Sequence, residues 1–262
     1  MPGLDRAVAI VGTRAADVEA LELAHDLAAD LCAAGCVVIS GGARGIDAAA
    51  HEGALSTGGR TVAVLASGFV PAYPPEHARL FARIEASGAL VSEHPDGTPP
   101  RAGLFLQRNR LVAALGRAVV VVQAPARSGA LSTASWARSL GRPVLVVPAA
   151  PWDPRGVGCL SLLRSGASVC AGARDVLSVC AFPARPCGAN ADDQVAVMHE
   201  ELDADGRRIL RALGARARHV DELVRATGWE VARIQRALLC LLLSGCVEER
   251  AGARWAPIRR RT

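Results

Sequence analysis

Short apolar, often β-branched runs alternate with longer alanine- and leucine-rich segments over the first two thirds of the chain. The short runs predict strands at 7–12, 36–40, 61–67, 88–93, 118–124 and 143–149, and the longer segments predict helices at 17–34, 45–56, 75–87, 107–115 and 129–140. Strands of this apolar density are buried on both faces, which indicates a parallel sheet between two layers of helices. The pattern therefore predicts an α/β fold, an extended Rossmann-like domain with a doubly wound, mostly parallel sheet.

The alternation ends near residue 180, and 181–203 gather proline, glycine, asparagine and acidic residues, as linkers do. Three segments with apolar residues at helical spacing follow, at 205–214, 219–228 and 229–245, and each ends at a glycine. The stretch CVEERAGARWAP, at 246–257, resembles a hairpin with a turn at Ala251-Gly252. Three helices and a hairpin form a winged helix-turn-helix, so we predict a Rossmann-like domain at 1–180, a linker at 181–203 and a small C-terminal winged-helix domain at 204–262.

The stretch SGGARGIDAAAH, which begins at Ser40, has the order strand, glycine loop, helix. Such a loop presents backbone N–H groups and a helix N-terminus to an anion, which predicts a phosphate site. Gly41 and Gly42 leave the backbone open to the anion, Gly45 lets the helix begin close to the sheet, and Arg44 adds a cation. The phosphate could belong to a nucleotide cofactor, a small substrate or a nucleic-acid backbone.

Two charged residues beside this loop refine the prediction. Arg14 follows the first strand, at the edge of the sheet where α/β proteins bind ligands. Its loop lacks the GxGxxG pattern of dinucleotide sites, which argues against NAD or FAD. Asp47 falls in the first helical turn and would repel a phosphate, so we expect it to point away or to hold Arg14 or Arg44.

Two further stretches carry candidate phosphate contacts. In PARSGALSTA, Ser128 and Gly129 stand at another helix start after a buried strand. In the usual strand order the first and fourth strands flank the point where the order reverses, so this loop and that of Arg14 are expected to share a crevice. QRNR contributes Arg108, Asn109 and Arg110, and because residues two apart lie about 200° apart on a helix, only one arginine can face the crevice.

Composition narrows the choice of partner. The sequence contains no lysine, so all 30 basic residues are arginines, whose planar guanidinium groups suit phosphate; the net charge is +5 and the pI about 9.0. Aromatic residues make up only 3%, which disfavours an aromatic platform that stacks bases. No nucleophile with a base and no metal-ligand spacing is present, so we expect neither catalysis, nor a metal, nor a cofactor. Without a signal peptide or a 20-residue apolar segment, a cytoplasmic protein with no membrane partner is expected.

Several linked motifs resemble the DNA-processing protein A (DprA, or Smf) family. SGGARGIDAAAH, QRNRLVAALG, RSGALSTA and GRPVLVVP occur in the order and spacing of that family. The resemblance implies a homodimeric single-stranded-DNA-binding protein that protects incoming strands and loads the recombinase RecA in natural transformation. It implies phosphate contacts from eleven residues: Arg14, Ser40, Gly41, Gly42, Arg44, Gly45, Arg108, Asn109, Arg110, Ser128 and Gly129.

The chain also departs from the family pattern. Gln123 stands where a glutamate is usual, Ala149 where a glycine is usual and Leu160 where an asparagine is usual, which leaves the finer shape of the crevice open. Only five residues precede Arg6, so we expect no counterpart of the helical domain that often precedes the Rossmann domain in this family.

Two alternatives stand beside this interpretation. The first is a nucleotide-processing enzyme of the lysine-decarboxylase-like Rossmann group, although its PGGxGTxxE motif does not occur here. The second concerns the winged helix, whose third helix carries Arg233 and Arg236 and could contact duplex DNA. We favour protein docking for this domain, because the apolar ALLCLLL indicates that the second half of that helix is buried.

Overall fold

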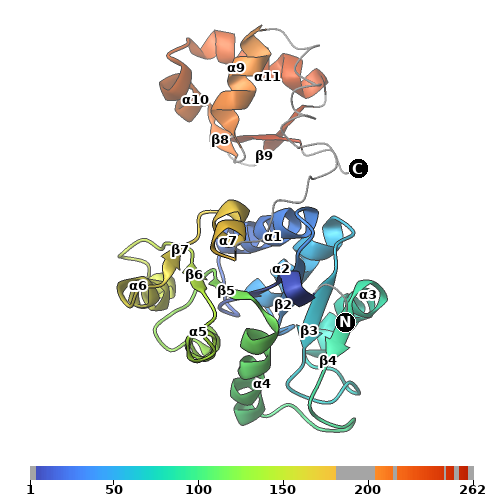
Figure 1. Ribbon diagram of the computed structural model, residues 1–262. Helices are drawn as coiled ribbons and strands as arrows, with labels where there is room; N and C mark the ends of the chain where they lie inside the picture. Colours follow the sequence, from blue (N-terminus) through green and yellow to red (C-terminus); the bar gives the residue numbers. More distant parts are fainter. Residues whose placement is uncertain (1–3, 181–203, 215–216, 245, 251–253, 259–262) are drawn as a thin grey trace. The chain divides into compact units, whose positions relative to one another are not determined.

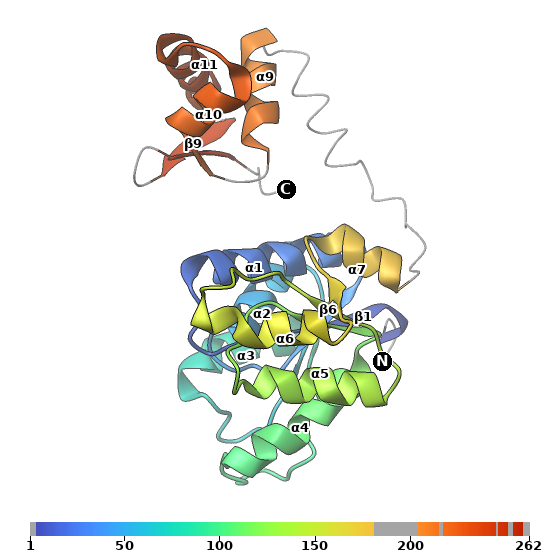
Figure 2. The ribbon, with the colours of Figure 1, turned by 90° about the vertical axis from the view of Figure 1, so that its left-hand side faces the viewer.

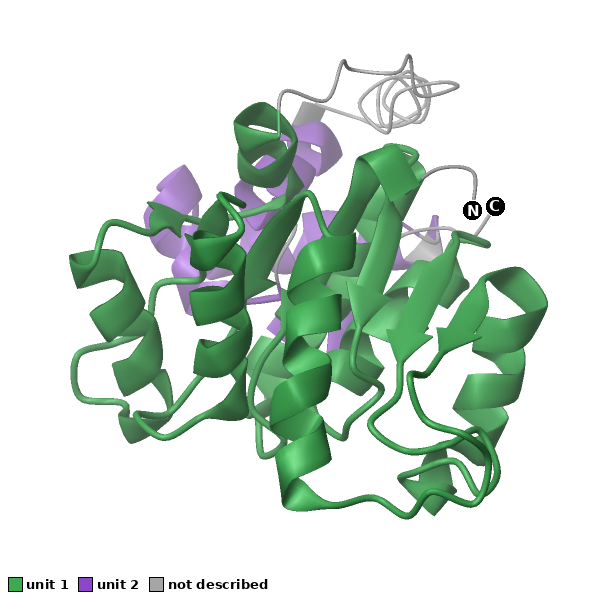
Figure 3. Cartoon of the chain, turned by 60° about the horizontal axis from the view of Figure 1, so that its bottom comes forward, with its two compact units in different colours: residues 1–187 green, residues 188–262 purple. Residues whose placement is uncertain are grey.

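The computed structural model describes residues 4–180, 204–214, 217–244, 246–250 and 254–258. The chain divides into two compact units, residues 1–187 and 188–262 (Figure 3). The linker predicted at 181–203 lies outside the described residues.

The first unit is built on one sheet in which every strand pairs in parallel with its neighbours. The strand order is β4-β3-β2-β1-β5-β6-β7 (Figure 1). The strands are β1 (Ala7–Val11), β2 (Val37–Ser40), β3 (Thr61–Val64), β4 (Ala89–Val91), β5 (Ala118–Val121), β6 (Val144–Val146) and β7 (Ser168–Val169). Order and pairing confirm the predicted doubly wound Rossmann-like sheet.

Helices cover both faces of this sheet (Figure 2). They are α1 (Val18–Ala33), α2 (Ile46–Ser56), α3 (Ala78–Ser87), α4 (Ala102–Leu115), α5 (Gly129–Ser139), α6 (Val157–Arg164) and α7 (Ala173–Val179). Alternate residues of β1 enter different cores: Ala7 and Ala9 pack with α4, α5 and α6, whereas Val8 and Ile10 pack with α1, α2 and α7. This burial on both faces explains the continuous apolar runs of the strands.

Three details differ from the sequence prediction. Helix α4 begins at Ala102 rather than at residue 107, because the helix-disfavouring Gly103 and three adjacent apolar residues hide the helical period at its start. Elements α6, β7 and α7 were not predicted; β7 has only two residues, and both are exposed, so it carries no apolar run. The short 3-10 helix at Pro75–His77 precedes α3 within the predicted helix 75–87.

In its described residues, the second unit has three helices and a three-stranded antiparallel sheet. The elements are α9 (Ala204–Leu213), β8 (Arg218–His219), α10 (Val220–Thr227), α11 (Val231–Leu243), β9 (Val247–Arg250) and β10 (Arg254–Pro257). Their core includes Ile209, Leu223, Ile234 and Leu238, all fully buried. This order confirms the predicted winged helix.

Candidate nucleic-acid interface

A cleft of about 620 Å³ lies at the carboxyl ends of the central strands of the first unit. The loops after β1, β2 and β5 and one side of α4 line it. Strand order reverses between β1 and β5, so the cleft occupies the position where doubly wound sheets bind ligands. The strand beside β1 is the fifth in the chain, not the fourth as predicted, because β4 extends the other half of the sheet.

The structure separates the eleven predicted site residues into two groups. Six line the cleft: Arg14, Gly41, Arg108, Asn109, Ser128 and Gly129. The other five, which are Ser40, Gly42, Arg44, Gly45 and Arg110, are not part of its lining. The Ser40 hydroxyl, for instance, is fully buried and donates to the carbonyl of Ile10 at 2.6 Å.

Two amides of the glycine loop are already occupied. Oδ2 of Asp47 accepts hydrogen bonds from the backbone N–H groups of Gly41 at 3.2 Å and Ala43 at 3.3 Å. The sequence prediction that Asp47 would point away or would hold Arg14 or Arg44 is therefore wrong, because its carboxylate accepts from the loop itself. Burial raises the pKa of this carboxyl, against the opposing effects of the nearby Arg108 charge and the hydrogen bonds.

Arg108 forms part of the cleft floor, although its side chain is only slightly accessible. The residue is 5% exposed, and its Nη1 donates to the carbonyls of Gly41 and Val64. Any side chain at Gly41 would collide with this guanidinium group, so the glycine is needed for the close approach. Burial lowers the pKa of Arg108, and the carboxylate of Asp47 opposes this effect.

Arg44 and Arg110 lie at the surface in ion pairs. Arg44 donates to Glu76, and Arg110 donates to both carboxylate oxygens of Glu93 at 2.5 and 2.7 Å. Arg108 and Arg110 therefore face different directions, as their spacing on the helix requires. Exposed pairs of this kind are weak and can be exchanged for other anions.

The loop after β5 begins α5 with a well-formed cap. The Ser128 hydroxyl accepts a hydrogen bond from the N–H of Ala130 at 3.3 Å. Asn109 donates to the carbonyl of Gly129 at 3.1 Å and so attaches this loop to α4. The Gly129 backbone is exposed, and a side chain there would meet almost nothing, so the helix start is open toward the cleft.

Two residues that the sequence interpretation did not assign also line the cleft. Arg127 is exposed and directly precedes Ser128, so its position in an already identified loop was the available signal. Phe105 lies beneath Arg14, whose guanidinium carbon is 4.7 Å from the ring centroid. Within the described part of the chain, neither Arg14 nor Arg127 has a carboxylate partner, so the cleft has two cations available for an anion.

Comparison with known proteins identifies the family. The family model for DNA recombination-mediator protein A matches residues 3–181, and that for the DprA winged helix domain matches residues 198–253. The chain belongs to the DprA family.

Relatives agree with this assignment. A putative DNA processing protein DprA from Mycobacterium tuberculosis is 43% identical over 255 residues, which cover 97% of this chain and 65% of the relative. The chain thus spans less than two thirds of the length of that relative. The solved structure of Streptococcus pneumoniae DprA matches with a TM-score of 0.62 at 35% identity, over 67% of this chain and 62% of that one.

A second DprA structure comes from Helicobacter pylori and was determined to describe its single-stranded DNA binding mode. It matches with a TM-score of 0.61 at 32% identity, over 67% of this chain and 80% of that one. Both matches confirm the Rossmann-like fold of the DprA family for this chain.

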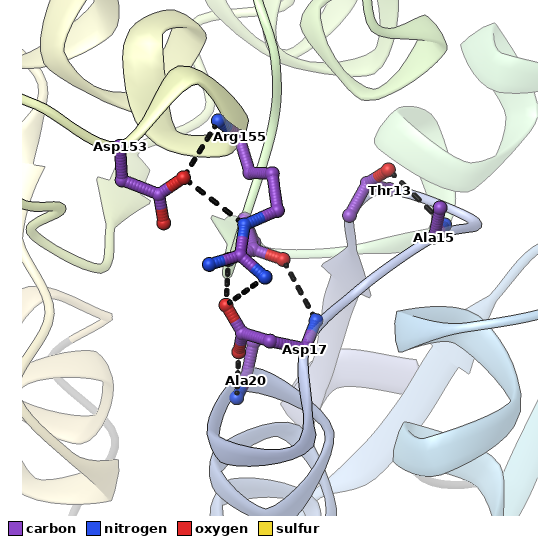
Figure 4. Close-up of polar contacts among 7 residues, drawn as sticks. Thr13, Ala15, Asp17, Ala20, Asp153 and Arg155 are labelled. Atoms are coloured by element: carbon purple, nitrogen blue, oxygen red, sulfur yellow. Dashed lines mark hydrogen bonds and ion pairs between the residues drawn. The ribbon is translucent and has the colours of Figure 1, made fainter.

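One departure from the DprA pattern, Gln123, has a local explanation. Nε2 of Gln123 donates to Oδ2 of Asp17 at 2.7 Å, and its Oε1 accepts from the N–H of Asp17 at 3.3 Å. Arg155 completes the cluster by pairing with both Asp17 and Asp153 (Figure 4). A glutamate at position 123 would place a second carboxylate against Asp17, so the amide suits this cluster. Ala149, another departure from the family pattern, is partly buried and packs against the core of the first unit.

The DprA winged helix differs from its prediction in one respect. Leu238 and Leu241 of α11 are buried, but Leu239 is 53% exposed and Leu242 is also exposed, so the second half of this helix is not buried throughout. Arg233, a candidate for contacting duplex DNA, instead pairs with Asp205 of α9.

Among the described residues, no helix is long and apolar enough to cross a membrane. In the same part of the chain, no group of three or more histidine, cysteine, aspartate or glutamate residues is arranged to hold a metal ion.

Proposed function

We propose that the protein binds single-stranded DNA in the cleft between β1 and β5 and acts as a recombination mediator without catalysing a reaction itself. The observation that carries this proposal is the pair of available arginines, Arg14 and Arg127, on the two loops that border the cleft. Guanidinium groups on opposite loops suit the successive phosphates of a strand, and phosphate contacts give affinity without sequence preference.

Phe105 supplies the second element of a single-strand site. Its ring lines the cleft beneath Arg14, and the guanidinium group stacked on the ring offers a flat cationic surface to an unpaired base. A duplex hides its base faces, so this combination favours single strands. Asp47 accepts from backbone amides and Glu93 pairs with Arg110, so both carboxylates are engaged with protein groups, which supports binding rather than hydrolysis.

Membership of the DprA family supports the remaining parts of the proposal: a cytoplasmic homodimer that protects incoming single strands and loads RecA. Stimulation of RecA filament formation on strands covered by a single-strand-binding protein tests the loading step. Light scattering of the purified chain tests the dimer.

The binding proposal is tested by fluorescence anisotropy with a labelled oligothymidine and with a duplex of equal length, from 50 to 300 mM salt. We expect the double variant Arg14→Ala/Arg127→Ala to bind the single strand at least about tenfold more weakly. The slope of log affinity against log salt should fall by about 1.4, which is about 0.7 for each lost phosphate contact.

The matched control is Arg117→Ala/Arg164→Ala. Both residues are exposed; Arg117 directly precedes β5 and Arg164 ends α6, the helix before β7, so both lie toward the opposite edge of the sheet from the cleft. The control removes the same charge and should bind nearly as the wild type. Equal losses in the two double variants, or wild-type preference for the duplex, would contradict binding in the cleft.

A further inference from the structure

The backbone of Gly41 is held from both sides by buried charged side chains. Its N–H donates to the carboxylate of Asp47, and its carbonyl accepts from the guanidinium of Arg108. The two side chains come from different elements, α2 and α4, and are 7% and 5% exposed. The loop after β2 is therefore fixed between an internal anion and an internal cation.

Asp47 occupies the position that the loop would otherwise offer to a phosphate. Two amides, those of Gly41 and Ala43, converge on the single oxygen Oδ2. Convergent backbone N–H groups of this kind are the usual donors to a bound anion. An external phosphate could reach them only by displacing a carboxylate that is buried and lies beside a cation.

Arg108 completes this arrangement from the other side. Its Nη1 donates to two backbone carbonyls, those of Gly41 and Val64, which connects the loop after β2 to the end of β3. Its Nε is buried and, among the described residues, has no hydrogen-bond partner. The nearby carboxylate of Asp47 supplies the compensating charge that a buried guanidinium requires.

We propose that Asp47 is the resident anion of the glycine loop and that Asp47 and Arg108 are positioning residues, which shape the loop for DNA without touching a phosphate. The part that concerns DNA rests on the proposed function. The part that concerns the resident anion does not, because it is a property of the free protein.

Chemical rescue tests the proposal that Asp47 is the resident anion. Asp47→Ala leaves two amides and a buried guanidinium without their anion, so we expect a lowered Tm that 100 mM sodium formate raises by about 3 °C or more relative to 100 mM sodium chloride. Wild type should show no such difference. The matched control is Asp175→Ala, because Oδ2 of Asp175 also accepts two backbone amides, from Ala171 and Gly172, without a buried arginine beside it.

Two results would contradict the proposal that Asp47 is the resident anion. One is a formate effect on Asp47→Ala no larger than that on Asp175→Ala. The other comes from a double-mutant cycle with Asp47→Asn and Arg108→Met, which also serves if Asp47→Ala does not fold. We expect the double variant to lose much less Tm than the two single variants together, since removing both charges leaves neither uncompensated. Additive losses would show that the two residues do not act as a pair.

The same double variant, Asp47→Asn/Arg108→Met, tests the positioning role in DNA binding. It has the net charge of the wild type, and we expect weaker oligothymidine binding with an unchanged salt slope, because no phosphate contact is lost. Arg14→Ala, measured beside it, should lower the slope by about 0.7. A slope reduced by about 0.7 in the double variant would mean that Arg108 contacts a phosphate. If the wild type does not bind DNA, the proposed function fails while the formate result still decides the resident anion.

Discussion

Acid should destabilise the Rossmann-like unit through His51, a fully buried residue of α2. Nδ1 of His51 lies 2.7 Å from Oγ1 of Thr61, and that hydroxyl donates to the carbonyl of Val38 at 2.9 Å, so Nδ1 carries the proton and donates. Nε2 is buried and has no hydrogen-bond partner among the described residues. A second proton would place a cation there without an acceptor.

The size of this effect follows from the pKa. Burial, and then the charges of Arg108 and His77, lower the pKa of His51 from 6.5 to about 3. Between these values the unfolded chain binds the proton and the folded protein does not, so stability is complete above pH 6.5 and is lost as the pH falls. The slope reaches about 1.4 kcal/mol per pH unit, which amounts to about 2 kcal/mol between pH 7.5 and pH 5.

Urea unfolding of the wild type and of His51→Asn, followed by circular dichroism from pH 7.5 to 5, measures this contribution. The asparagine amide keeps a donor for Thr61 but cannot take up a proton. We expect the wild type to lose about 2 kcal/mol more than the variant over this range. Other titrating groups are common to both proteins and cancel in the difference. Parallel pH profiles would refute the reasoning. If the two units unfold separately, the transition that the substitution shifts belongs to the Rossmann-like unit.

Three further outcomes are expected. Gly45→Ala should lower the free energy of unfolding by about 3 kcal/mol or more in the same urea assay, because the φ of Gly45 is +76° and a side chain there would collide with the loop after β1. Gly58→Ala should lower it by only about 1 kcal/mol, because Gly58 has a φ of +67° but open space around it. In the winged helix, Leu238→Ala should cost about 2–5 kcal/mol and the half-exposed Leu239→Ala less than about 0.5, measured by thermal unfolding. Deletion of residues 204–262 should leave most of the affinity for single-stranded DNA, as measured by anisotropy titration. A large loss of affinity in a folded truncation would contradict a site in the cleft.

The fold was predictable because its main signals are local. Apolar runs that are buried on both faces indicate parallel strands wherever they occur, and the glycines after the helices of the second unit mark their ends. Gly214 and Gly228 do have positive φ values, of +62° and +70°. The missed elements lie between residues 150 and 180, where an exposed two-residue strand has no pattern to detect.

The candidate site was predictable only as a set of loops. The sequence placed Arg14 and Ser128 at the correct edge of the sheet, since that depends on strand direction alone. It did not predict that Asp47 would accept from two amides of the glycine loop or that Arg108 would turn inward to backbone carbonyls. The hydrogen-bond partners of Asp47 and Arg108 depend on how α2 and α4 pack around the loop, and this packing involves residues that are far apart in the chain.

The pairing of β1 with β5 also has a consequence during synthesis. Val8 pairs with Ala118, so one edge of β1 stays open until the ribosome has completed the intervening chain, on the order of 10 s at ordinary elongation rates. An unpaired edge of a buried apolar strand is a template for wrong strand pairing. Until β5 is synthesised, the sheet can contain only β1 to β4, the cleft cannot form, and the edge of β1 is open to wrong pairing.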